Sequence, residues 1–233
     1  MKSFAQTALA LVLVASAAAC GSQSQDTNAA ANNDSEVAST NTSEQQSNPF
    51  AESESKMSQA MMAAAGSDVG DNWAKKMIAH HQGAIDMSEA VLREDPKQDV
   101  AEMARMTIEK NRKDIADIQK LTKDGSPDQK SAELYRPSMM DMKQKMEAAS
   151  GADINELFMR KMLEHHKGAV AMSDVALRNG VSGAMRSQVQ KTRSENDKDA
   201  KMTEAMLRGE PMKESMAKSS TTGDDAAHDM NSM

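Results

Sequence analysis

Residues 76–92 read KMIAHHQGAIDMSEAVL, and residues 161–177 read KMLEHHKGAVAMSDVAL. The two segments align without a gap, Lys76 with Lys161 and Leu92 with Leu177, and nine of their seventeen positions are identical. Each segment holds two adjacent histidines, with one methionine before the pair and another after it. A segment written twice at a constant offset predicts one structural unit that occurs twice in the fold.

The two copies belong to longer helical patterns. Apolar residues recur at three- and four-residue spacing, and no alternation typical of strands is present. We expect long helices over residues 71–93, 99–123, 153–178 and 181–208, and shorter ones over 137–149 and 57–65. The predicted fold class is all-α: a ferritin-like four-helix bundle made of two repeated helical hairpins, with a short extra helix between them.

Both ends of the chain differ from this helical part. Residues 1–19 have a charged start, an apolar run and small residues, which predict a secretory signal peptide. Cys20 follows directly and is similar to the lipidated cysteine of bacterial lipoproteins; the alternative is an exported protein cut near Ala19. Residues 20–56 and 213–233 are polar and predict a disordered tether and a disordered, methionine-containing tail. The helical domain is therefore expected over 57–212, with repeats over 71–123 and 153–208.

Composition limits the classes of function. The formal net charge of -7 argues against a nucleic-acid-binding protein, which would carry a basic patch. The chain has 22 methionines but only 2% aromatic residues, so methionine takes much of the space that aromatic side chains usually fill. The single cysteine cannot form a disulfide within the chain.

A helical wheel places both histidines of each pair on the apolar side of their helix. His81 and His166 fall near the middle of the apolar arc, and His80 and His165 fall toward its edge. A single buried histidine is ordinarily a hydrogen-bonded core residue, but up to four buried imidazoles without partners would be costly. A metal ion, or a set of buried hydrogen bonds, is needed to offset that cost. The candidate ligands are Met77, His80, His81, Met87, Met162, His165, His166 and Met172.

The residue types around the histidines indicate which metal. Four-helix bundles that bind two irons use Glu-x-x-His, but the positions three before His80 and His165 hold Met77 and Met162. Thioethers suit Cu(I), and zinc prefers cysteine, histidine and carboxylate. We therefore expect copper, as Cu(I), with Ag(I) as its chemical mimic. Asn111 and Asn196 lie at equivalent mid-helix positions, where they either orient the imidazoles or act as polar residues that set the helix register.

Further methionines form local clusters outside the repeat. Each one is explained individually as flexible core filler, but clusters in polar contexts also suit labile Cu(I) sites. The clusters are Met57, Met61 and Met62; Met139, Met140, Met142 and Met146; and Met202, Met206, Met212 and Met216.

The paired Met-x-x-His-His-x-x-Ala segments, each preceded by an aromatic residue (Trp73 and Phe158), resemble the domain-of-unknown-function family 305. The resemblance covers residues 71–207, which is more than half of the chain. It implies a ferritin-like helical fold, export from the cytoplasm and, as in some bacterial members, an association with copper binding and resistance. Many relatives have glutamine where this chain has Asn111 and Asn196, and a long insert near residues 137–151 separates the two halves.

We expect a periplasmic lipoprotein of the bacterial cell envelope that sequesters, buffers or relays Cu(I) and supports copper tolerance. Its expected partners are the metal ion, the membrane through Cys20 only, and a copper exporter or chaperone. Two alternatives stay open: a ferritin-like metal oxidase, and a methionine-rich helical adaptor that binds no metal. The scarcity of inward carboxylates favours a binding protein over an enzyme. The sequence leaves open whether the chain is a homodimer, whether the two histidine pairs share one site, and which membrane holds it.

Overall fold

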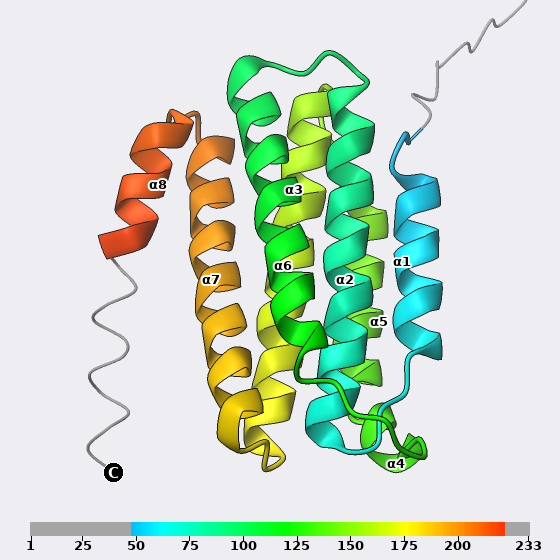
Figure 1. Ribbon diagram of the computed structural model, residues 1–233. Helices are drawn as coiled ribbons and strands as arrows, with labels where there is room; N and C mark the ends of the chain where they lie inside the picture. The colour runs from blue at the N-terminus through cyan, green and yellow to red at the C-terminus, as the bar shows by residue number, and fades with distance from the viewer. Residues whose placement is uncertain (1–47, 222–233) are drawn as a thin grey trace, which may run out of the picture. The chain divides into compact units, whose positions relative to one another are not determined.

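The computed structural model describes residues 48–221, and its regular elements are all α-helices (Figure 1). Their order is α1 (Ala51–Ala63), α2 (Val69–Leu92), α3 (Gln98–Gln119), α4 (Gln129–Glu133), α5 (Arg136–Ala148), α6 (Ile154–Arg178), α7 (Gly183–Leu207) and α8 (Met212–Thr221). The predicted all-α bundle is confirmed. Within residues 48–221, no helix is both long and apolar enough to cross a membrane. The predicted signal peptide, Cys20, the tether up to residue 47 and the tail after residue 221 lie outside the described residues.

Both predicted hairpins are present, and their first helices meet at the centre. α2 packs against α3, α6 packs against α7, and α2 also packs against α6. An aspartate begins each central helix: Asp68 accepts a hydrogen bond from the backbone N–H of Asp71, and Asp153 accepts one from Glu156. These caps satisfy backbone donors that have no partner inside the helix. The repeat therefore also sets where α2 and α6 start.

The repeat unit contains three helices, not two. The bounds of α5 are those of α1 moved along the chain by the same offset that separates His80 from His165. α1 packs on α2 and α5 packs on α6 (Figure 1). The Lys76 ammonium donates a hydrogen bond of 3.0 Å to the carbonyl of Met61, and that of Lys161 donates one of 2.8 Å to the carbonyl of Met146.

The segment expected to be an insert, residues 137–151, is therefore the second copy of α1 and its connection. Only five of the thirteen positions of α1 and α5 are identical, which hides this relationship in the sequence. The expectation of an insert was wrong because α1 and α5 differ at most positions, so their equivalence is not visible in the sequence.

The helical region extends beyond its predicted bounds at both ends. α1 begins at Ala51, inside the segment expected to be a tether, and α8 occupies the start of the expected tail. The Phe50 ring is fully buried and lies 5.8 Å from the ring of Phe158, while Met212 is 1% exposed. A single large apolar residue anchors each of these polar segments, so their average composition was misleading. The short helix α4 was also not predicted.

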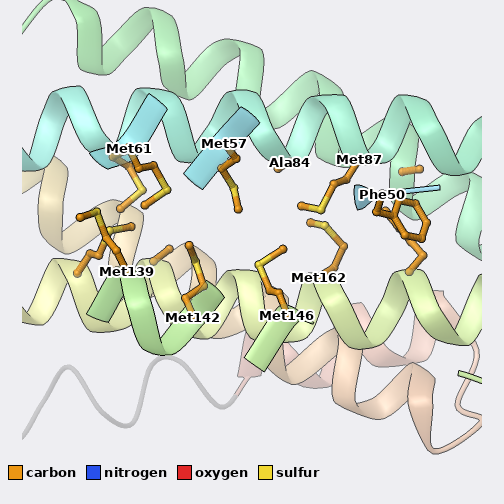
Figure 2. Packing of buried hydrophobic residues seen from close by; sticks show 14 of the residues in the cluster. Phe50, Met57, Met61, Ala84, Met87, Met139, Met142, Met146 and Met162 are labelled. Carbon is orange, nitrogen blue, oxygen red and sulfur yellow. The ribbon is translucent and has the colours of Figure 1, made fainter. Parts of the chain in front are cut away.

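Methionine is the main residue of the core. Methionines make up 13 of the 28 buried members of the hydrophobic cluster in the described part of the chain. Figure 2 shows several of them projecting from α1, α2, α5 and α6 into a common space. Met212 belongs to this cluster and Met216 packs against it, so these two are core residues and not an exposed metal-exchange cluster. Most of the methionine content is therefore explained by packing.

Candidate metal centre

His80 and His165 meet where α2 and α6 cross. Their rings stack with centroids 3.6 Å apart and planes inclined by 28°. The Nε2 atom of His80 lies 3.1 Å from the carbonyl oxygen of His165, and the Nε2 atom of His165 lies 3.1 Å from the carbonyl oxygen of His80. This reciprocal arrangement marks the pseudo-twofold axis that relates the two repeats.

The reciprocal hydrogen bonds define the tautomer of both rings. A carbonyl oxygen can only accept, so Nε2 carries the proton in His80 and in His165. The Nδ1 atom of each ring then holds a lone pair. Both Nδ1 atoms are buried and have no hydrogen-bond partner in the structure. An imidazole that donates one N–H to a backbone carbonyl and keeps the other nitrogen free has the arrangement usual for a metal-binding histidine.

Burial keeps these imidazoles neutral. Loss of solvation, reinforced by the neighbouring histidines, holds the pKa of His80 and of His165 well below the ordinary value of 6.5. Burial also lowers the pKa of His81 to about 4, and it lowers the pKa of His166. Because a metal competes with protons for the same lone pair, neutral imidazoles at pH 7 are ready to bind one.

His81 and His166 face the second helices of the hairpins. His166 donates from Nδ1 to the Oδ1 atom of Asn196 on α7 at 3.1 Å. The amide of Asn196 is oriented by its own donation to the carbonyl of Thr192. His166 therefore keeps its lone pair on Nε2. His81 is 2% exposed, yet neither of its ring nitrogens has a hydrogen-bond partner in the structure.

The two asparagines differ although they are equivalent in the repeat. Asn111 donates to the carbonyl of Thr107, just as Asn196 donates to Thr192. Asn196 also accepts from His166, whereas the structure gives Asn111 no hydrogen bond to His81. Within residues 48–221, Asn196 thus orients an imidazole, whereas the side chain of Asn111 bonds to its own helix.

A cluster of charged side chains from α3 and α7 lies beside His81 and His166. Lys110 on α3 pairs with Asp199 on α7, and Lys191 on α7 pairs with Asp114 on α3 at 3.1 Å. The charges of Lys110, Asp114 and Asp199 act on the pKa of His81. Burial raises the pKa of the nearby Glu195 carboxyl. Sequence reasoning missed this group, although Asp114 and Asp199 are equivalent positions of the repeat.

The four methionines of the repeat are all buried in the core. Met77 and Met162 are fully buried, and so is Met87, while Met172 is 1% exposed. Figure 2 shows Met87 of α2 and Met162 of α6 pointing toward each other between their helices. The structure therefore places thioethers from both repeats in one core together with the histidine pairs.

The helical wheel ranked the histidines differently from the structure. His80 and His165 form the central pair, whereas His81 and His166 lie to the side of α3 and α7. The wheel failed here because α2 and α6 are each covered on several sides, so the middle of the apolar arc is not the contact between the repeats. All four histidines are buried, at 0–4% exposure.

The buried histidines share their core with buried methionines. Among residues 48–221, no group of three or more histidine, cysteine, aspartate or glutamate side chains is placed to hold a metal ion. Methionine sulfur is the other soft donor in this core. Such donors suit Cu(I) and Ag(I) better than zinc or iron.

The family model described as a domain of unknown function, DUF305, matches residues 18–122, 122–207 and 155–233. The chain belongs to the DUF305 family. The first two matches end at residues 122 and 207. These two positions are 85 residues apart, the same separation as between His80 and His165. The family assignment and the internal repeat of this DUF305 protein therefore agree. No curated protein and no solved structure is similar enough to match the chain.

Proposed function

We propose that this DUF305 protein binds a monovalent soft metal ion, Cu(I) with Ag(I) as its mimic, in the core between α2 and α6. The observation that carries the proposal is the set of unpartnered imidazole nitrogens: Nδ1 of His80, Nδ1 of His165 and both ring nitrogens of His81. Buried polar atoms nearly always have a partner. A metal ion would supply the missing partners, and the core methionines would supply sulfur.

The proposed role is to sequester, buffer or relay Cu(I) in the bacterial envelope, with the chain anchored through a lipid on Cys20. A copper exporter or chaperone would be the exchange partner. The burial of the histidines supports a metal-storage role more than a catalytic one, because a bound ion would be screened from water. The alternative is a ferritin-like metal oxidase, which oxygen consumption on adding Cu(I) or Fe(II) would support.

Competition with a chromogenic Cu(I) chelator tests the core site. We expect the paired variant His80→Gln/His165→Gln to bind Cu(I) at least about a hundredfold more weakly than the unaltered protein, since losing even a residue that orients a metal ligand typically costs about 10–100-fold. His228→Gln, the same change at the histidine outside the repeats, is the control and should leave the affinity unchanged. Equal affinities for the paired variant and the control would overturn the proposal.

A thermal shift measurement gives an independent readout. A ligand of the native state stabilises it by about 2.7 kcal/mol when its free concentration is a hundred times its Kd. We expect Ag(I) to raise the Tm of the metal-free protein, with a smaller rise for Zn(II). A melting temperature that does not respond to Cu(I) or Ag(I) would favour the adaptor that binds no metal.

A further inference from the structure

A groove of about 370 Å³ lies between α1 and α5, on the side of α2 and α6 that these two helices cover. Its lining comes only from α1, α5 and Asn48. Seven methionines contribute to it. One is Met140, which is 47% exposed. The others are Met57, Met61, Met62, Met139, Met142 and Met146.

The methionines of the groove range from exposed to buried. Met140 lies at the rim, while Met57 and Met142 are 4% and 3% exposed at the floor. A Cβ atom added to Gly83 would overlap Met57, and one added to Gly168 would overlap Met142. Gly83 and Gly168 lie one helical turn after His80 and His165, so the floor of the groove rests on α2 and α6 close to the central histidines.

Five of the seven groove methionines are also buried members of the hydrophobic cluster. Methionine is the residue that adapts most easily to fill gaps in a core. Here the flexible side chains of two helices surround a space that they leave open. Figure 2 shows Met57 and Met61 of α1 near Met139, Met142 and Met146 of α5. The two methionine clusters, far apart in the sequence, thus face one groove.

The acidic groups at the groove are already engaged. Glu54 pairs with the buried ammonium of Lys161 at 2.6 Å, and Glu147 pairs with Lys143. Neutralised carboxylates attract a hard cation weakly, whereas seven thioethers line the groove. Thioether sulfur selects monovalent soft ions over Zn(II), Mg(II) and Ca(II).

We propose that the groove between α1 and α5 is a second soft-metal site, built from thioethers alone and separate from the histidine centre. It takes Cu(I) or Ag(I) from solvent and lies on the route to the core. This inference rests on the proposed function for its choice of metal, but the groove binds its ion without the histidines.

The test uses the full chain and Ag(I). The variant Met57→Leu/Met61→Leu/Met139→Leu/Met142→Leu removes four sulfur atoms with nearly conserved volume, which cores usually tolerate. The control, Met103→Leu/Met202→Leu/Met206→Leu/Met212→Leu, removes four buried sulfur atoms outside the groove. Isothermal titration should show at least one Ag(I) fewer bound by the groove variant and no loss for the control. An unchanged Ag(I) stoichiometry and affinity in the groove variant would overturn the groove site.

A second measurement leaves the methionines of the groove unchanged. In protein labelled with ¹³C at the methionine methyl groups, Ag(I) should shift the resonances of Met57, Met61, Met139 and Met142 in the His80→Gln/His165→Gln background. The resonances of Met103 and Met202 should stay in place. If the groove resonances do not move in that background, the separate site is wrong. If the histidine centre fails its own test while the groove resonances still shift, the proposed core site is wrong and the groove stands.

Discussion

His80 and His165, far apart in the sequence, hold each other's rings: each donates from Nε2 to the other's backbone carbonyl at 3.1 Å. Neither ring can rotate without breaking the bond that orients it. The Nδ1 lone pairs are therefore held in place before any ligand arrives, which reduces the entropy lost on binding. The same relationship makes the folded state less stable in acid, because a second proton on either ring would be buried without a hydrogen-bond partner.

The metal-free protein should lose stability as the pH falls below about 6.5. Between that pH and about 4, unfolded chains carry a proton on His81 that the folded protein does not bind, so protonation favours unfolding. His81 alone should cost on the order of 3 kcal/mol by pH 4. Urea unfolding at a series of pH values measures this loss. His81→Gln should show a flatter pH dependence, and an equal slope in both proteins would contradict the assignment.

Asn196→Ala should destabilise the protein more than Asn111→Ala. The first change leaves the buried Nδ1–H of His166 without its acceptor, which costs about 1–3 kcal/mol. The second removes only a hydrogen bond to the carbonyl of Thr107. The asparagines are 6% and 7% exposed, so burial is matched. Equal free energies of unfolding for the two variants would show that the bond to His166 contributes nothing.

Gly83→Ala should destabilise the protein, although alanine normally favours a helix over glycine by about 0.5–1 kcal/mol. The added methyl group would overlap Met57, and overpacking of this kind typically costs about 1–3 kcal/mol. A double-mutant cycle with Met57→Ala checks the cause, because the penalty should shrink once the large side chain is gone. Additive effects would mean that the methyl group meets no obstruction from α1.

Glu54→Gln should lower the free energy of unfolding by about 1–3 kcal/mol, the value of a hydrogen bond to a charged group. The carboxylate of Glu54 pairs with the Lys161 ammonium at 2.6 Å, where their side chains are 11% and 1% exposed. Loss of the charge would leave that ammonium with the carbonyl of Met146 as its remaining strong partner. Glu52→Gln, at an exposed position of the same helix, is the matched control and should have little effect. Differential scanning calorimetry of the two variants decides between them.

The sequence by itself determined the four long helices and the repeat that relates them. The 3.6-residue periodicity predicts helices because it places apolar side chains on one side, and aspartate, glycine and proline mark their ends. The constant offset between the two copies of the repeat predicted that His80 and His165 would be equivalent. Sequence reasoning worked less well where average composition misleads, as at Phe50 and Met212, which anchor otherwise polar segments.

Only the tertiary structure decided how the repeats face each other. A helical wheel describes one helix in isolation, but α2 is covered by α1, α3 and α6. Where those helices pack therefore decides that His80, and not His81, is the central residue. The same holds for Asn196, which reaches a histidine while its equivalent Asn111 does not. It also holds for the methionines of α1 and α5, because two clusters from different repeats form one groove only after α2 and α6 have packed together. Local periodicity sets the helices, but long-range packing selects which donors meet.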